Sequence, residues 1–232
     1  MKKTLLVLLT SISVLGYTQE KKGYIGLSLG FSTPTGDFVS KNIDNDAAGF
    51  ANSGVNFNLS FAYKLKGNFG ITAMLHSQAH SIDAQAFVDD VAKENPGTVW
   101  SLESGSWSIS GLMVGGYGSF PISEKVSFDT RLMMGFLTAK APTFRLSTPI
   151  LGTEFWVEQD AGSASSFAYL LGAGFKFDLG NKVSLLTNLD YIGSNPEFND
   201  VKITDSLGGK DTNSFKQSMG SVNLSVGIAL RI

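Results

Sequence analysis

The sequence predicts an all-β protein, an eight-stranded antiparallel transmembrane up-and-down β-barrel with four long extracellular loops and three short periplasmic turns. Three observations lead to this prediction. Apolar and polar residues alternate in about eight segments, the connections between these segments are alternately long and short, and the polar side of the segments consists mostly of small uncharged residues. Alternation with a period of two is typical of β-strands that have one apolar face.

The last strand shows the alternation most clearly. Its large aliphatic residues are Val222, Leu224, Val226, Ile228, Leu230 and Ile232. Seven earlier segments follow the same pattern, at residues 24–32, 55–65, 69–77, 106–120, 126–136, 167–177 and 183–191. In the segment 106–120, Trp107 and Ile109 have one phase, and the apolar residues after Gly111 have the other. Because a slip of one residue exchanges the two faces, we expect either a β-bulge near Gly111 or a wrong assignment of the phase.

The connections between the strands alternate in length. The short ones are residues 66–68, 121–125 and 178–182, and the long ones are residues 33–53, 78–105, 138–165 and 193–217. All the long connections therefore lie at one end of the strands, which is the asymmetry of bacterial outer-membrane barrels. We expect one or two turns of helix between Ala84 and Val91, because the apolar residues there have helical spacing. We also expect a projecting hairpin between Phe144 and Val157.

The polar face of the strands indicates which side of the barrel faces inward. A soluble barrel places Lys and Glu on its outer face, whereas Gly, Ser, Asn, Ala and Thr suit the narrow interior of eight strands. The apolar face then contacts lipid. We expect the inward polar residues to pair as a polar plug, because an isolated charge there is costly. This predicted lumen network consists of Asn56, Asn58, Arg131, Asn188, Asp190 and Asn223. The alternative reading of the same residues is a narrow pore for small solutes.

The first 18 residues have the pattern of a cleaved signal peptide. Lys2 and Lys3 precede an apolar core from Leu5 to Leu15, and small residues lead to an expected cleavage near Thr18 and Gln19. The apolar run is shorter than the ~20 residues that span a bilayer as a helix. The expected organisation is a signal peptide at residues 1–18 and one outer-membrane barrel domain at residues 19–232.

The chain resembles the small outer-membrane barrels of the OmpA transmembrane domain, OmpX and OmpW type, in the form common in Bacteroidota. The most specific match is the carboxy-terminal assembly signal of that family, which Ser225, Gly227 and Leu230 fit. Ile232 occupies the last position of the signal, where the family usually has an aromatic residue. The resemblance implies a monomer in outer-membrane lipid, inserted by the barrel-assembly machinery and located in the bacterial outer membrane.

The sequence contains few residues that are suited to catalysis, metal binding or nucleic-acid binding. It contains no Cys and two His residues, and its formal net charge is −2, which gives no basic face for nucleic acid. His76 and His80, with Ser77 and Ser81 beside them, suggest a lipid-modifying enzyme, but neighbours on one strand point to opposite faces. Asp44 and Asp46 do not have the spacing of a calcium loop. We therefore expect no catalytic residues, no metal and no cofactor.

The long loops are the best candidates for contact with a ligand. They contain four aromatic residues that the strands do not account for: Trp100, Phe144, Phe155 and Trp156. Functional residues concentrate on loops that a rigid scaffold positions. The sequence thus predicts a non-enzymatic outer-membrane protein with a structural or surface-interaction role, a largely plugged lumen, and an extracellular ligand or surface partner of unknown identity. An OmpW-like channel is the alternative, and a lipid-modifying enzyme is a more remote one.

Overall fold

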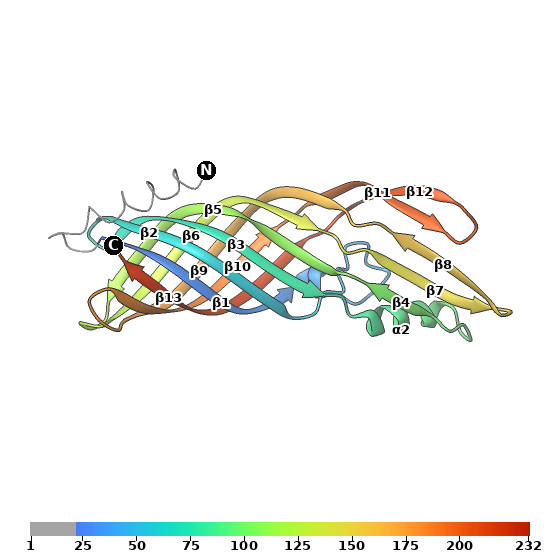
Figure 1. The fold of residues 1–232 in the computed structure, drawn as a ribbon, viewed down its shortest axis with the longest axis horizontal. Helices are drawn as coiled ribbons and strands as arrows, with labels where there is room; N and C mark the ends of the chain where they lie inside the picture. The colour runs from blue at the N-terminus through green and yellow to red at the C-terminus, as the bar shows by residue number, and fades with distance from the viewer. Residues whose placement is uncertain (1–21) are drawn as a thin grey trace, which may run out of the picture.

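The computed structural model describes residues 22–232, and the expected signal peptide lies outside them. Eight strands close into an antiparallel barrel in the order β1-β13-β10-β9-β6-β5-β3-β2 (Figure 1). Their bounds are β1 Gly23–Thr35, β2 Gly54–Lys66, β3 Phe69–Ser81, β5 Ser106–Pro121, β6 Val126–Lys140, β9 Ser163–Asp178, β10 Val183–Ser194 and β13 Met219–Arg231. The predicted eight-stranded up-and-down barrel is confirmed. The barrel closes where β1 pairs with β13, with Leu27 opposite Ile228.

The strands continue beyond their predicted ends on the side of the long connections. β6 reaches Lys140 and β9 begins at Ser163, and these two residues are paired with each other. The predicted segments ended at Phe136 and began at Phe167. Outside the apolar band neither face has to be apolar, so the alternation stops while the backbone pairing continues.

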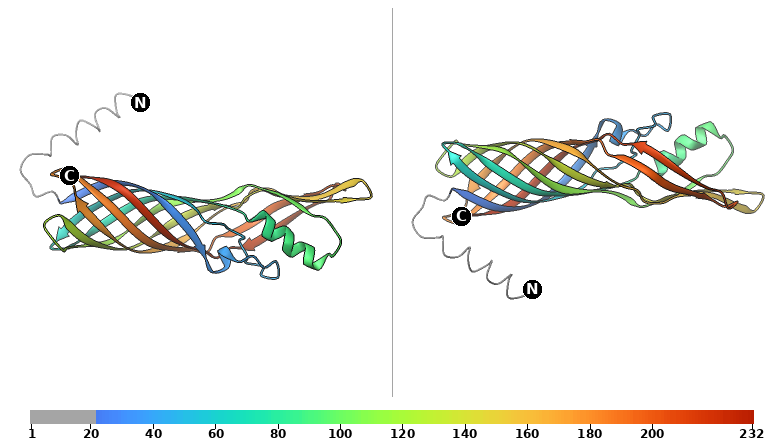
Figure 2. Two further views of the ribbon diagram at one scale, coloured as in Figure 1. Left: turned by 90° about the horizontal axis from the view of Figure 1, so that it is seen from below. Right: turned by 90° about the horizontal axis from the view of Figure 1, so that it is seen from above.

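The long connections form a second structure at one end of the barrel (Figure 2). A five-stranded sheet has the order β12-β11-β8-β7-β4. Its strands are β4 Ser101–Ser104, β7 Phe144–Ile150, β8 Thr153–Gln159, β11 Glu197–Asp205 and β12 Lys210–Lys216. The expected hairpin is β7-β8, and the hairpin β11-β12 was not predicted. The expected helix is α2, Ala84–Glu94, which is longer than predicted and packs against β4; a 3-10 turn, η1, covers Gly36–Val39.

β5 contains no bulge near Gly111. Its pairing with β3 and with β6 is continuous from Ser108 to Gly118. Trp107 and Ile109 are buried, whereas Leu112 and Val114 are about half exposed. The expectation of a bulge was therefore wrong and the alternative, a wrong phase, is correct, because the top of the lumen contains large apolar residues instead of small ones.

The outer surface of the barrel is an apolar band. The exposed side chains include the large residues of every barrel strand, among them Leu29, Phe57, Leu132, Leu171 and Val226. Aromatic side chains pair on this surface, for example Phe136 with Phe167 at a ring separation of 6.2 Å. In the part of the chain that the structure describes, no helix is long and apolar enough to cross a membrane.

The interior divides into two halves. Strands β5, β6, β9 and β10 contribute most of the large apolar side chains, including Met113, Met133, Leu137, Leu170 and Ile192. Strands β1, β2, β3 and β13 contribute mainly polar side chains, including Ser32, Asn56, His76, Gln78 and Ser221. Buried side chains from both halves fill the lumen, as expected for an eight-stranded barrel.

Candidate functional site

The end of the barrel that carries the long connections is closed by aromatic side chains. Phe38, in the turn η1, is fully buried and packs edge-on against Trp107 with the ring centroids 5.7 Å apart. Trp107 also contacts Phe198 of β11 at 6.0 Å, and its indole nitrogen donates a hydrogen bond of 3.0 Å to the carbonyl oxygen of Gly49. The first connection is thereby held over the lumen, and the last connection contributes Phe198.

A cavity of about 210 Å³ lies above this aromatic closure. All four long connections contribute to its wall. The phenyl rings of Phe50, Phe87 and Phe144 form one side, with Phe50 and Phe87 at 5.0 Å and Phe87 and Phe144 at 6.3 Å. Phe215 of β12 lines another part and stacks on Phe198 at 4.9 Å. The cavity is mostly apolar and opens to solvent.

Two glutamines, Gln159 and Gln217, belong to the polar part of the cavity wall, together with Asn213 and Asp46. Gln159 is only 7% exposed and, among the residues that the structure describes, none forms a hydrogen bond with its side-chain amide. The Nε2 atom of Gln217 donates a bond of 2.7 Å to the carbonyl oxygen of Ala47, which leaves Oε1 of Gln217 without a described donor. Asp46, which is exposed, lines the same cavity. The wall therefore offers hydrogen-bonding groups that the folded chain itself does not use.

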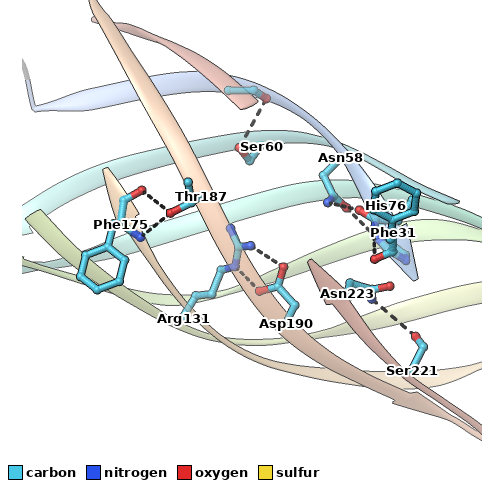
Figure 3. Close-up of polar contacts among 12 residues, drawn as sticks. Phe31, Asn58, Ser60, His76, Arg131, Phe175, Thr187, Asp190, Ser221 and Asn223 are labelled. Carbon is cyan, nitrogen blue, oxygen red and sulfur yellow. Dashed lines mark hydrogen bonds and ion pairs between the residues drawn. The ribbon is translucent and has the colours of Figure 1, made fainter. Parts of the chain in front are cut away.

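The predicted lumen residues Arg131 and Asp190 lie in contact (Figure 3). Nε of Arg131 donates to Oδ1 of Asp190 at 2.8 Å, and a terminal nitrogen of the guanidinium donates to Oδ2 at 2.5 Å. The pair spans the intervening strand β9 at Gly172, which is opposite Arg131 on one side and Asp190 on the other. A Cβ atom at Gly172 would lie 2.0 Å from Oδ1 of Asp190. The glycine therefore provides the space in which the ion pair forms.

A chain of amides and imidazoles occupies the polar half of the lumen. Asn58 donates to Oδ1 of Asn56 at 3.2 Å, and its own Oδ1 lies 2.6 Å from Nδ1 of His76. Nε2 of His76 lies within hydrogen-bond distance of Oε1 of Gln78. The same oxygen of Gln78 accepts hydrogen bonds from the hydroxyl groups of Ser32 and Ser221. Another predicted member, Asn223, donates to Ser221 at 3.4 Å, and its Oδ1 has no partner. These residues form a network with more members than the sequence suggested.

Asn188 differs from the other five predicted lumen residues, whose side chains all form hydrogen bonds. Its side chain forms no hydrogen bond with a described residue and lines a cavity of about 10 Å³ beside Arg131. Gly174, opposite Asn188 on β9, leaves this space open. A cavity of this size has room for about one water molecule.

The histidines do not form a catalytic site with Ser77 or Ser81. His76 and His80 are 3% and 1% exposed and face the lumen, whereas Ser77 and Ser81 have the opposite phase on β3. Nε2 of His80 lies 3.2 Å from the hydroxyl of Ser32, which is also fully buried. A group that acts on a lipid has to be reached by it, and these side chains are enclosed.

The four loop aromatics occupy different environments. Phe144 lines the cavity, and Phe155 has the same strand phase on the paired strand β8. Trp156 lies on the opposite face of the sheet, where the guanidinium of Arg145 stacks over its ring at 4.5 Å. Trp100 precedes β4, and its buried indole nitrogen has no hydrogen-bond partner among residues 22–232. Only Phe144 of the four is therefore part of the cavity wall.

Asp83 fixes the helix that carries Phe87 in the cavity wall. Its carboxylate caps the amino end of α2 by accepting from the Ala86 amide at 3.1 Å, and it forms an ion pair with Lys41. The bond from Lys41, and then that from Ala86, lowers the pKa of Asp83 below its usual 3.8. A lowered pKa in the folded state stabilises the helix above pH 3.8, and this contribution is lost as the pH falls through the lowered pKa.

We expect replacement of Asp83 by alanine to destabilise α2 by about 1 kcal/mol, the usual cost of losing an amino-terminal cap. Hydrogen exchange of the α2 amides at about pH 7, where Asp83 is ionised, measures the change. When both proteins are compared at the same pH, the α2 amides of the wild type should exchange as fast as those of Asp83→Ala only at a pH low enough to protonate Asp83. Asp89→Ala, on the same helix, is the control, and equal exchange in the two variants would contradict this role for Asp83.

The family model of the outer membrane protein beta-barrel domain matches residues 4–229. The chain belongs to this family. A search of curated proteins by sequence finds no match. Solved structures of outer-membrane barrels match at low identity and show the fold alone.

Three of these structures illustrate the similarity. A major outer membrane protein of Thermus thermophilus has 13% identity and a TM-score of 0.51, and the match covers 91% of this chain and 98% of that protein. Ail, the attachment invasion locus protein of Yersinia pestis, has 14% identity, a TM-score of 0.44, and coverage of 91% and 99%. The outer membrane protein W of Escherichia coli has 11% identity, a TM-score of 0.39, and coverage of 93% and 100%.

Membership of the family places this outer-membrane barrel in the bacterial outer membrane and makes its apolar band the lipid contact. The end that carries the second sheet is then the extracellular end, because long loops face outward in such barrels. Three residues of the expected assembly signal lie on β13, and the fourth, Ile232, directly follows this strand. Ser225 and Gly227 face the lumen, Leu230 is 57% exposed toward lipid, and the backbone of Ile232 pairs with Gly23.

The sequence did not reveal several cavity residues of this barrel. Phe50 and Phe87 lie in segments that were expected to be loop and helix, with no sign that they would meet. Phe215 is in the hairpin β11-β12, whose turn contains Gly208 and Gly209. A Gly-Gly pair between alternating residues is a hairpin signal. That signal could have predicted the strands, but not their position over the mouth of the barrel.

Proposed function

We propose that this protein is a non-enzymatic, non-conducting outer-membrane barrel that anchors an extracellular binding module. The module consists of the five-stranded sheet, the helix α2 and the first connection. Outer-membrane lipid and the barrel-assembly machinery are the expected partners of the barrel, and the module supplies the surface for an extracellular ligand.

One observation carries this proposal: the lumen is filled while the module above it is ordered and hollow. Met74, Met113 and Met133 are at most 2% exposed in the middle of the barrel, and Phe38 closes its mouth. The internal cavity beside Arg131 has about 10 Å³, against about 210 Å³ for the cavity in the module. Hydrated ions need a continuous water path, and the filled lumen therefore supports a closed barrel.

The proposal is tested by single-channel recording. The refolded protein is inserted into planar bilayers in concentrated KCl, and a known porin in the same bilayer is the positive control. We expect no conductance steps, because buried apolar side chains and a paired Arg131 leave no path for ions. Discrete steps that depend on the protein concentration would contradict the proposal and favour the narrow solute channel.

A further inference from the structure

The extracellular module is much more acidic than the chain as a whole. Residues 36–53, 82–105, 141–162 and 195–218 contain 15 Asp and Glu residues and 6 Lys and Arg residues, a formal net charge of −9, whereas the whole chain has −2. These four segments are the connections that surround the cavity. Clefts lined by charges of one sign concentrate solutes of the opposite sign. The net negative charge of the module therefore attracts cations to this end of the molecule.

The wall of the cavity matches a cation that carries an apolar group. Phe50, Phe87, Phe144 and Phe215 present aromatic rings, and the faces of aromatic rings attract organic cations. Among the described residues, no Lys or Arg side chain lines the cavity, whereas Asp46 does. The wall therefore has aromatic faces and a carboxylate but no group that would neutralise an anion.

The side-chain amide of Gln159, which faces the cavity, is a second and independent indication of a ligand. This side chain belongs to a residue that is only 7% exposed, lies in the cavity wall, and forms no hydrogen bond with any described residue. A polar group that the folded chain leaves without a partner bonds to water or to a ligand. The free Oε1 of Gln217 lies in the same wall. Two carbonyl oxygens and one carboxylate could accept the N–H groups of an ammonium ion.

We propose that the cavity binds a small organic cation, a primary or secondary ammonium ion that carries one apolar ring or a chain of similar size. The size follows from the volume of about 210 Å³, since a cavity of ~150 Å³ holds benzene. The ring packs among the phenyl groups, the ammonium group donates to Gln159 and Gln217, and Asp46 at the rim contributes attraction. This inference rests on the proposed role of the module as a binding surface.

Binding is measured by titration calorimetry on the full chain in detergent micelles at low salt. The probes are 2-phenylethylammonium, its neutral analogue 2-phenylethanol, and the anion 3-phenylpropanoate. We expect saturable binding of the cation, roughly tenfold weaker binding of the alcohol because a hydrogen bond from a charged donor is lost, and no binding of the anion. Preference for the anion, equal affinity for the cation and the alcohol, or no saturable binding would overturn the inference.

Two pairs of variants connect the binding to the named residues. Asp46→Asn should lower the affinity for the cation by about twofold to fivefold, as expected for the loss of an exposed ion pair. The affinity for the alcohol should not change. Asp44→Asn, an exposed acid on the same connection that does not line the cavity, is the matched control. Gln159→Leu should lower the affinity for the cation by about tenfold or more. Its control is Gln85→Leu, because Gln85 lies on the exposed face of α2.

The outcomes separate this inference from the proposed function. If Gln159→Leu does not fold, the exposed pair Asp46 and Asp44 still decides the result, and identical affinities in those two variants would overturn the assignment of the cation site. Saturable binding of the anion alone would contradict the proposed specificity for a cation, but it would still support the proposed role of the module in binding. Conductance steps would contradict the closed barrel without affecting the cavity.

Discussion

Replacement of Arg131 by alanine is expected to lower the free energy of unfolding by about 3–5 kcal/mol, the usual cost of removing one partner from a buried ion pair. Asp190 is 2% exposed, and its two carboxylate oxygens both accept from Arg131. Without the guanidinium, a buried carboxylate remains in the lumen with Gly172 beside it and, among the described residues, no other cation in contact. Urea unfolding in lipid vesicles measures the loss.

Arg145→Ala is the matched control for this variant. Arg145 forms a surface ion pair with Glu158 at 3.8 Å, with more than a third of each side chain exposed. Exposed pairs of this kind contribute about 0–1 kcal/mol. A double variant, Arg131→Met with Asp190→Leu, should recover much of the stability, because it removes both charges and leaves apolar side chains of similar size. An Arg131→Ala barrel as stable as Arg145→Ala would refute the structural role of the pair.

Replacement of Gly227 by valine is expected to prevent closure of the barrel. A Cβ atom at this position would lie 2.3 Å from the carbonyl oxygen of Leu27 and 2.5 Å from Cβ of Ser28, so the backbone of β1 would have to move. Both contacts lie at the pairing of β1 with β13, the last one needed to close the barrel. The folded fraction after refolding into vesicles is read from the mobility of unheated samples on SDS gels.

Gly116→Val is the control for the closure experiment. Gly116 is also in a barrel strand, β5, and a Cβ atom there meets nothing within 4 Å. The Gly116→Val variant should therefore fold to the same extent as the wild type. Refolding in vitro contains no assembly machinery, so a defect of Gly227→Val reports packing and is independent of any role of Gly227 in the assembly signal. Normal folding of Gly227→Val would show that β1 adapts to the extra side chain.

The barrel strands could be predicted because lipid imposes a strict pattern on them. One face of each strand has to be apolar over the thickness of the bilayer, and the other face fits a narrow lumen, so residues such as Phe57 and Asn58 alternate without exception through the middle of β2. The pattern failed at Trp107 and Ile109. There the lumen meets its aromatic closure, and large apolar side chains face inward.

The pair Arg131 and Asp190 could be predicted because an inward charge requires a partner, and these two residues have the same face on strands that are close together. The cavity could not be predicted in this way. Its residues belong to connections whose pairing depends on where the barrel places them, and no local pattern relates Phe50 to Phe87 or to Phe144. Phe144 was selected as an unassigned loop aromatic, whereas Gln159 has no sequence signal at all.

The hydrogen bond between Gln217 and Ala47 joins residues 170 positions apart in the chain. The two residues stand on the connections next to β13 and β1, the strands that meet only when the barrel closes. Bringing together such distant parts of a chain has an entropic cost that is met only after the intervening structure exists. We therefore expect the extracellular cavity to be the last part of the molecule to form, so an antibody against its rim would recognise finished barrels and ignore every intermediate of their assembly.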